Sequence, residues 1–337
     1  MTPSDRELTT PRLIGHAGFG RRAFLQALAL SGGLAAIGPR FGRQAAAFAA
    51  QTPQPGGTYR VLTNEQFGSL DAARAFNYMD WWISYMTLYN RLYQYDAELQ
   101  LQPDLADGMP EVSEDGLTYT IKLKPGVKFH NDREMTAEDV KFSFDRQLWP
   151  EVEAYGGSFL TNVVGYDELA GLAADPGAAV DPDRSLTGVQ VVDPLTISIA
   201  LKQPQSILPG VLGIGVFGIV PKEETLAAGP DWGTTTVIGT GPFKLSEWIS
   251  GERVVCERNP DYFHSGKPYL DRVEMELNVA PETAVLRWEA GEAEMIASAP
   301  PAELARIRGD ATLAARIRET PSTISYRMQF SDKAPLY

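Results

Sequence analysis

Short alternations of hydrophobic and polar residues dominate the pattern of this chain and predict many β-strands. The clearest alternation covers residues 117–123, where Leu117, Tyr119 and Ile121 are separated by threonine residues. This period of two is that of a strand with one buried face. Pro125-Gly126 then predicts a turn. The other predicted strands cover residues 58–63, 189–192, 195–201, 243–248, 253–257, 271–278 and 322–330.

Helical periodicity occurs in fewer segments. Trp81, Tyr85 and Tyr89 recur every four residues within the aromatic-rich stretch 71–90, which predicts a helix. This aromatic stripe either packs in the core or faces a ligand cleft. Thr136, followed three residues later by Asp139, predicts a helix start of the capping-box type. Two more helices are predicted, one in the alanine- and acid-rich stretch from residue 166 and one over residues 281–290.

The N-terminal segment has the pattern of an export signal. Arg21, Arg22, Phe24 and Leu25 form the core of a twin-arginine motif. The apolar stretch that follows, residues 27–37, is shorter than the roughly 20 residues that a membrane-spanning helix needs. Small residues near Ala49 suit a signal peptidase. We therefore expect residues 1–49 to be a cleaved signal and the mature protein to be periplasmic; an ordinary secretory signal is the alternative.

Composition and charge narrow the class of protein. The 337 residues are enough for two domains, and 44% hydrophobic residues is normal for a globular chain. Beyond residue 49 the chain has 24 basic and 41 acidic residues, a net charge of -17. Such a charge repels phosphate backbones and anionic membrane surfaces, so nucleic acid is not expected as a partner. Solubility is its simplest role, and a preference for cationic ligands is the alternative.

The sequence offers little for catalysis. Residues beyond the predicted signal include two histidines, His130 and His264, and a single cysteine, Cys256, which forms no internal disulfide. These residues make a poor set of metal ligands. The motif Gly213-Ile-Gly-Val-Phe-Gly218 matches a dinucleotide fingerprint, but Pro209 and Pro221 flank it, so it is interpreted as a buried loop or strand. We expect neither an enzyme nor a cofactor; a periplasmic hydrolase is the rival hypothesis from another class.

Several blocks, taken in order, resemble one known family. They are Leu88-Tyr-Asn-Arg-Leu92, Leu101-Gln-Pro-Asp-Leu-Ala106, residues 113–124, Gly126-Val-Lys-Phe-His130, Met135-Thr-Ala-Glu-Asp-Val140, Gly239-Thr-Gly-Pro-Phe243, Arg258-Asn-Pro-Asp-Tyr-Phe263 and Gly291-Glu-Ala-Glu294. Together they are similar to the extracellular solute-binding proteins of family 5, which serve peptide, opine and nickel ABC importers. Members of that family continue for roughly 200 more residues at the C-terminus. The chain therefore resembles a C-terminally truncated member.

The resemblance implies an α/β fold with two lobes, the periplasmic-binding-protein fold of type II, cluster C, with the second lobe incomplete. It implies a first lobe made of residues 50–98 and 186–278, with an additional subdomain at 99–185. Residues 279–337 would begin the second lobe. A monomer would hold a peptide or related small solute between the lobes and deliver it to an ABC importer in the membrane. A receptor for a metal or metal chelate, and a remnant that binds nothing, are the alternatives.

Eight residues are predicted to line the ligand cleft. They are Asn64, Glu65, Gln66 and Phe67 after the first strand, Trp82 and Tyr85 in the aromatic helix, and Thr240 and Gly241 in the loop before Pro242. Asn64 or Glu65 would hold an amine, and the aromatic rings would stack on apolar groups. A place in a turn or in the core is the alternative for each of them. The sequence does not indicate which ligand is bound.

Overall fold

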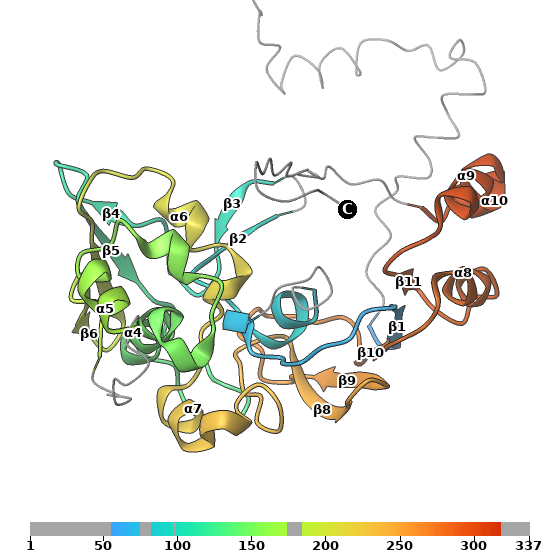
Figure 1. Cartoon of the computed structure of the whole chain (residues 1–337), viewed down its shortest axis with the longest axis horizontal. Helices are drawn as coiled ribbons and strands as arrows, with labels where there is room; N and C mark the ends of the chain where they lie inside the picture. The colour runs from blue at the N-terminus through green and yellow to red at the C-terminus, as the bar shows by residue number, and fades with distance from the viewer. Residues whose placement is uncertain (1–54, 75–81, 97–98, 174–183, 318–337) are drawn as a thin grey trace, which may run out of the picture. The chain divides into compact units, whose positions relative to one another are not determined.

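A five-stranded sheet forms one part of the fold (Figure 1). The computed structural model describes residues 55–74, 82–96, 99–173 and 184–317. Within them the strand order of this sheet is β11-β1-β10-β9-β8. Strand β1 pairs in parallel with both β10 and β11, whereas β8 and β9 form an antiparallel hairpin. The bounds are β1 Thr58–Leu62, β8 Phe243–Ile249, β9 Arg253–Arg258, β10 Arg272–Glu276 and β11 Met295–Ile296.

A four-stranded antiparallel sheet of order β4-β5-β7-β6 forms a second part. Strand β5 has the predicted alternation, because Tyr119 and Ile121 are buried while Lys122 is exposed. Helix α4 packs on β6 and β7 (Figure 1). The bounds are β4 Glu111–Val112, β5 Thr118–Lys122, β6 Val189–Asp193, β7 Thr196–Ala200 and α4 Ala137–Asp145. A separate two-stranded hairpin pairs β2 (Tyr93–Tyr95) with β3 (Leu101–Pro103).

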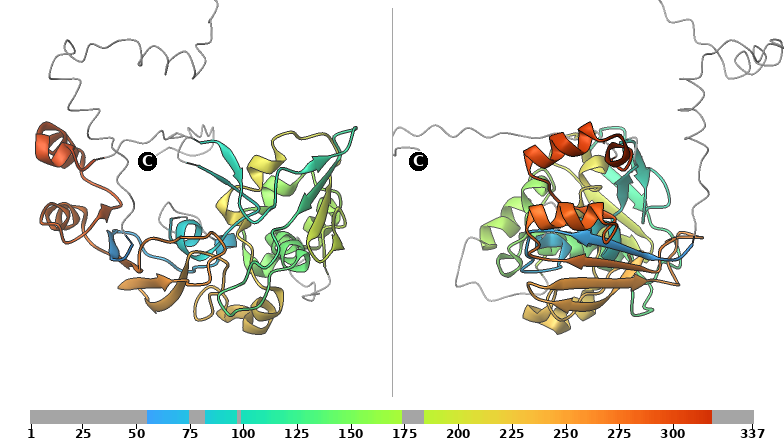
Figure 2. Two further views of the ribbon diagram at one scale, coloured as in Figure 1. Left: turned by 180° about the vertical axis from the view of Figure 1, so that it is seen from behind. Right: turned by 90° about the vertical axis from the view of Figure 1, so that its right-hand side faces the viewer.

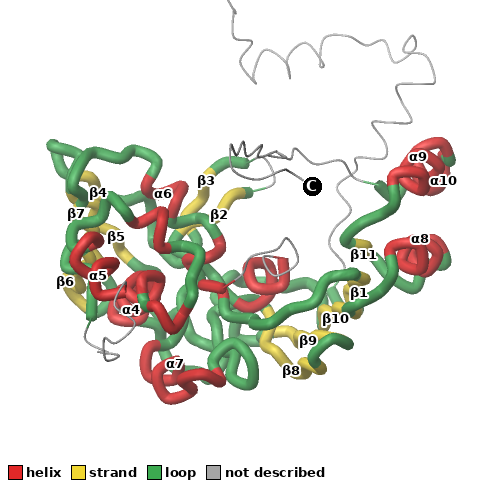
Figure 3. The backbone as a smooth tube through the Cα atoms, in the orientation of Figure 1, coloured by secondary structure: helices red, strands yellow, loops and turns green. Residues whose placement is uncertain are grey.

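The helices are short, and loops make up much of the path between them (Figure 3). Helix α4 begins with the predicted capping box: the backbone N–H of Thr136 donates to the Asp139 carboxylate at 2.8 Å. The aromatic stretch ends in a π-helical turn, η2 (Ser84–Leu88). The other helices are α5 Tyr166–Ala173, α6 Leu208–Val211, α7 Lys222–Ala228, α8 Pro281–Glu289, α9 Pro301–Gly309 and α10 Ala311–Ala314. The 3-10 turns are η1 Ala72–Arg74, η3 Arg146–Leu148, η4 Pro150–Val152, η5 Gly157–Leu160, η6 Gly215–Phe217 and η7 Gly229–Asp231.

Two large hydrophobic clusters correspond to the two sheets. One gathers residues of β5, β7 and α4, including Ile121, Val140 and Ile197. The other lies against the five-stranded sheet and includes Val61, Cys256 and Met275. Cys256 is a fully buried core side chain, as predicted.

Strand pairing differs from the lobe boundaries inferred from the sequence. The prediction placed β6 and β7 in the first lobe, apart from the subdomain at 99–185, but β7 pairs with β5 of that subdomain along its whole length. The prediction also placed β11 in the second lobe, but β11 pairs with β1 (Figure 2). Both differences arise because pairing partners distant in sequence leave no local signal. The division into lobes otherwise stays a prediction.

Some predictions lie outside the described residues: the export motif at Arg21, Arg22, Phe24 and Leu25, the cleavage region, Trp81 and the strand at 322–330. Among the helices that the structure describes, none combines the length and the apolar character that crossing a membrane requires.

Candidate functional site

Three of the predicted ligand residues, Asn64, Glu65 and Gln66, directly follow the carboxyl end of β1. Because β1, β10 and β11 are parallel, their carboxyl ends meet at one edge of the sheet. Backbone bonds fix this edge: the N–H of Val279 donates to the oxygen of Thr63 at 2.9 Å, and the N–H of Ala297 to that of Leu62, also at 2.9 Å. In open α/β sheets, ligands bind beyond the carboxyl ends of parallel strands. The edge is therefore a candidate ligand site.

Asn64, Glu65 and Gln66 are the polar residues of this edge. Asn64 and Gln66 are exposed, and Glu65 is partly buried. The backbone N–H of Glu65 donates to the Thr63 hydroxyl at 3.1 Å, which closes a short turn directly after the strand. Ser298, which follows β11, donates its hydroxyl to the Asn64 side-chain oxygen at 3.3 Å. Ser298 was not among the predicted residues; only its place after a strand that pairs with β1 reveals it.

Phe67 belongs to the core and not to this edge. Its side chain is 5% exposed and packs in the cluster against the five-stranded sheet. The prediction that Phe67 lines a cleft is therefore not supported by its position. The three residues after Thr63 are polar, and the chain then enters the core at Phe67. The only sequence signal for this burial was that Phe67 is a single hydrophobic residue within a polar stretch.

The two predicted aromatic residues make different contacts. Trp82 stacks on Tyr59 of β1, with ring centroids 6.1 Å apart and an interplanar angle of 20°. The ring of Tyr85 occupies the space beside Gly215: a Cβ on that glycine would lie 1.0 Å from the Tyr85 ring. The Arg91 guanidinium lies 4.9 Å from the centroid of the same ring. Burial raises the pKa of Tyr85 well above its ordinary value, so its phenol is neutral.

Thr240 and Gly241 are buried in a loop that is held from several directions. The Thr240 hydroxyl donates to the Asn90 side-chain oxygen and accepts from the Asn90 N–H, each at 3.3 Å. The N–H of Gly241 donates to the Leu88 oxygen at 3.0 Å. A Cβ at Gly241 would lie 2.3 Å from the Thr87 oxygen, so only glycine permits this approach. In this structure both residues make structural contacts.

His130 holds the same loop from the other side. The N–H of Gly239 donates to Nδ1 of His130 at 3.2 Å, so Nδ1 is an acceptor. Nε2 therefore carries the proton, which it donates to the Gly241 oxygen at 3.1 Å. Lys244 donates to the His130 backbone oxygen at 2.8 Å. Burial, and secondarily the nearby Lys244 charge, lowers the pKa of His130 to about 4. The ring is thus neutral, with both nitrogens engaged.

A second polar network lies beside Thr240. Asn90 donates to both carboxylate oxygens of the fully buried Asp104, at 3.1 and 2.9 Å. Nε2 of His264 lies 3.1 Å from one of those oxygens. Each of the two histidines thus joins segments that are distant in sequence. Among the residues that the structure describes, no group of three or more histidine, cysteine, aspartate or glutamate side chains is arranged to hold a metal ion.

Comparison with known proteins decides the family. The family model described as "Bacterial extracellular solute-binding proteins, family 5 Middle" matches residues 100–337, which is more than half of the chain. The chain belongs to this family. The match confirms the resemblance inferred from the sequence motifs.

Relatives of this family 5 protein bind peptides according to their names. The chain is 30% identical over 271 residues to the dipeptide-binding protein of Escherichia coli, covering 75% of this chain and 46% of that protein. It is 29% identical over 239 residues to di/tripeptide-binding protein 4 of Pseudomonas aeruginosa, covering 68% of this chain and 42% of that protein. The chain thus spans about half the length of the curated relatives that it matches.

Two solved structures show the same fold. The OppA structure from Burkholderia pseudomallei matches with a TM-score of 0.67 and 20% identity, covering 77% of this chain and 49% of that chain. The murein tripeptide-binding protein MppA of Escherichia coli matches with a TM-score of 0.67 and 21% identity, covering 77% and 49%. These matches confirm the predicted two-lobed α/β class, and this chain covers about half of each matched structure.

Proposed function

We propose that this family 5 protein captures a peptide or a related small solute and delivers it to an ABC importer in the membrane. The observation that carries the proposal is the parallel pairing of β1 with β10 and β11, by which the turn with the exposed Asn64 and Gln66 lies beside the carboxyl ends of two further strands. Membership of the family supports the function, and the peptide-binding relatives favour a peptide as ligand.

The chemistry of the edge suits the amino end of a peptide. Glu65 provides a carboxylate that would attract an ammonium group, and Asn64 and Gln66 provide amide donors and acceptors for a peptide backbone. The net charge of the chain, -13, adds a general attraction for cations. Trp82 and Tyr85 remain proposed stacking partners for apolar side chains. Thr240 and Gly241 would act by holding the loop before β8, not by touching the ligand.

Export is part of the same proposal. We infer that residues 1–49 direct the chain through the twin-arginine route, that cleavage occurs near Ala49, and that the mature protein works as a periplasmic monomer without catalytic activity. The motif at Arg21 and Arg22 supports this inference. Mass spectrometry of the protein isolated from the periplasm of its source tests it, because the N-terminal residue of the mature chain is read directly.

Ligand capture is tested by native mass spectrometry followed by calorimetry. Protein purified from the periplasm should carry a small molecule whose mass is that of a peptide. Titration with dialanine should then show binding that weakens about tenfold, or about 1.4 kcal/mol, in Glu65→Gln. Glu114→Gln, at an exposed glutamate in the turn between β4 and β5, is the matched control and should bind as the wild type does.

N-acetyl-dialanine, which lacks the ammonium group, separates the role of Glu65 from peptide binding as such. It should bind Glu65→Gln and wild type equally. A protein that carries no small molecule and binds neither dialanine nor trialanine would contradict the proposed peptide ligand. Equal weakening by the Glu65 and Glu114 variants would place the ligand elsewhere.

A further inference from the structure

Asn64 and Ser298 lie at matching positions just beyond the paired ends of β1 and β11. The parallel pairing of these strands matches Leu62 with Ile296. Extending that register by two positions on each strand matches Asn64 with Ser298, and residues opposite each other in a sheet have side chains close enough to interact. The contact is present, since the Ser298 hydroxyl donates to Oδ1 of Asn64 at 3.3 Å.

The backbone that leads to this contact is held on both sides of β1. The N–H of Ala297 donates to the Leu62 oxygen at 2.9 Å, and the N–H of Thr63 donates to the Glu276 oxygen at 3.0 Å. Leu62 and Ile296 also pack in one small hydrophobic cluster. The sheet therefore determines where the side chains of Asn64 and Ser298 meet.

This contact decides which end of the Asn64 amide is available to a ligand. A side-chain amide has an oxygen that accepts hydrogen bonds and an NH₂ group that donates two. Ser298 engages the oxygen, so the NH₂ group points away from Ser298. Asn64 is exposed, and its NH₂ group has no acceptor among the residues that the structure describes. At the sheet edge, Asn64 therefore offers donors.

Two available N–H donors favour an acceptor on the ligand. In a peptide the acceptors are the carbonyl oxygens and the terminal carboxylate, whereas the ammonium group only donates. An ammonium group beside the NH₂ group of Asn64 would place donor against donor. Of the two residues that the sequence offered for an amine, Asn64 and Glu65, the orientation of the amide makes Asn64 unsuitable.

We propose that Ser298 is a positioning residue that orients the Asn64 amide, so that Asn64 binds a carbonyl or carboxylate oxygen of the peptide and not its ammonium group. The inference rests on the proposed peptide function and adds which chemical group of the ligand lies at Asn64. Without the Ser298 hydroxyl, the amide rotates freely and presents its donors to the ligand in only a fraction of its orientations. The apparent affinity falls by that fraction.

Substitution of Asn64 distinguishes the two chemical groups, with dialanine as the probe in calorimetry of the full-chain protein. Asn64→Ala removes the donors and should weaken binding about two- to tenfold, the usual range for one hydrogen bond. Asn64→Asp puts a charged acceptor in their place, so it should bind dialanine more weakly than Asn64→Ala does. Gln203→Glu adds the same charge at an exposed residue after β7 and should bind as the wild type does. Asn64→Asp binding as tightly as Asn64→Ala, or more tightly, would overturn the proposal, because an ammonium group gains from that charge.

Ser298→Ala tests the positioning role. It should weaken dialanine about two- to fivefold. Because Ser298 is exposed, the melting temperature should stay the same. Ser298→Thr keeps the hydroxyl and should bind nearly as the wild type does. Ser265→Ala, at an exposed serine in the loop between β9 and β10, is the matched control and should change nothing.

The double variant of Ser298 and Asn64 completes the test. In the Asn64→Ala background, Ser298→Ala should cause no further loss of affinity, because the amide that it orients is absent. Equal losses in both backgrounds, or a loss that Ser298→Thr does not restore, would overturn the positioning role. Wild-type binding of dialanine that no variant alters would contradict this inference alone. A wild type that does not bind dialanine would contradict the peptide function, and this inference with it.

Discussion

His130 and Gly239 bind each other twice: the backbone N–H of His130 donates to the Gly239 oxygen at 2.9 Å, and the Gly239 N–H donates to Nδ1 of the His130 ring at 3.2 Å. The pair joins the turn after Phe129 to the loop before β8. Since Nδ1 is an acceptor here, a proton on Nδ1 would face another donor. The contact is therefore sensitive to acid.

Acid should destabilise the protein through His130. Its pKa is about 4 in the folded protein, below the ordinary value near 6.5 in an unfolded chain. The unfolded state thus binds the proton first as the pH falls, so stability is lost between about pH 6.5 and pH 4. The loss should reach roughly 2–3 kcal/mol. Urea unfolding at several pH values measures it.

His130→Asn isolates this effect. The variant should show a flatter pH profile, with the difference from wild type growing below pH 6.5. Asp145 acts in the opposite direction: burial raises its pKa to about 6, so its protonation favours the folded state as the pH falls through that value. Lys128→Asn, at an exposed residue of the same turn, should keep the wild-type profile. Identical profiles for wild type and His130→Asn would disprove the assignment.

Breaking the Asp71–Arg146 pair should be strongly destabilising. Asp71→Asn leaves the buried Arg146 without its counter-charge, and the expected cost is about 3–5 kcal/mol in the free energy of unfolding. Arg146→Met should cost a similar amount. The double variant should cost clearly less than the sum of the two, because neither charge is then left alone.

The surface pair of Arg74 and Glu153 provides the control, since these side chains are 39% and 73% exposed. Arg74→Met should cost about 1 kcal/mol or less. Additive losses in the Asp71 and Arg146 double variant would show that the two residues do not act as a pair.

Gly215→Ala should destabilise the protein because the ring of Tyr85 already fills the space. We expect a cost of about 3 kcal/mol or more, at the upper end for overpacking. Gly171→Ala, where no atom of the described residues lies within 4 Å of the added Cβ, should be neutral or slightly stabilising. In a Tyr85→Leu background the cost of Gly215→Ala should fall by at least half, as thermal or urea unfolding would show. An unchanged cost there would mean that some other contact excludes the methyl group.

Phe67 and Asn64 should respond differently to truncation although they are three residues apart. Phe67→Ala removes a core ring and should cost about 3–5 kcal/mol of stability. Asn64→Ala changes an exposed residue and should alter stability by about 0.5 kcal/mol or less. Its effect should instead appear in ligand affinity. A stable Phe67→Ala variant with lost affinity would restore Phe67 to the ligand site.

The local pattern of the sequence predicted local structure well. The alternation around Ile121 gave a strand, and the pair Thr136 and Asp139 gave a capped helix, because both signals depend on neighbouring residues. The glycine motif at 213–218 was interpreted as a buried loop or strand and not as a nucleotide site; in the structure Gly215 gives room to the Tyr85 ring.

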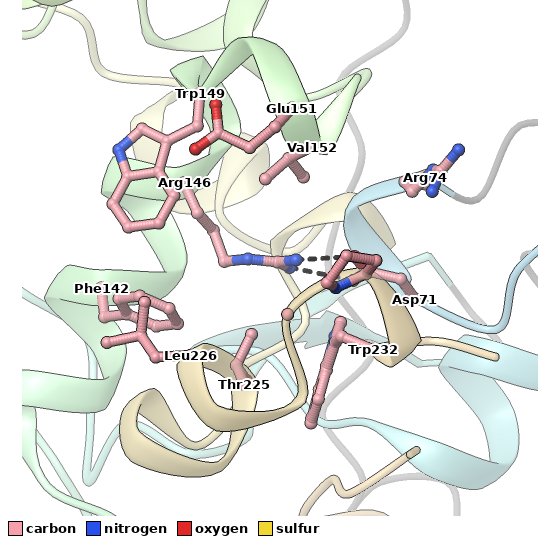
Figure 4. A pocket seen from close by; sticks show the side chains of 12 residues that line it. Asp71, Arg74, Phe142, Arg146, Trp149, Glu151, Val152, Thr225, Leu226 and Trp232 are labelled. Atoms are coloured by element: carbon pink, nitrogen blue, oxygen red, sulfur yellow. Dashed lines mark hydrogen bonds and ion pairs between the residues drawn. The ribbon is translucent and has the colours of Figure 1, made fainter. Parts of the chain in front are cut away.

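Contacts between distant segments were harder to predict. Thr240 bonds to Asn90 and β7 pairs with β5, but neither contact has a signature in the nearby residues. The ion pair of Asp71 and Arg146 (Figure 4) also escaped prediction, because its two residues are 75 positions apart in the sequence. The contact between Ser298 and Asn64 is different, because it can be inferred once β1 is known to pair with β11.

The parallel pairing of β1 also determines when the five-stranded sheet can form during synthesis. The backbone N–H of Gly57, just before β1, donates to the carboxylate of Asp271, 214 positions later in the chain. At about 5–20 residues per second, a ribosome needs roughly 10–40 s to make that interval. During that time β1 lacks its partner strand β10, so this sheet forms only after the ribosome has passed Asp271. The proposed export route, which carries folded proteins, would suit a strand whose partners are made so much later.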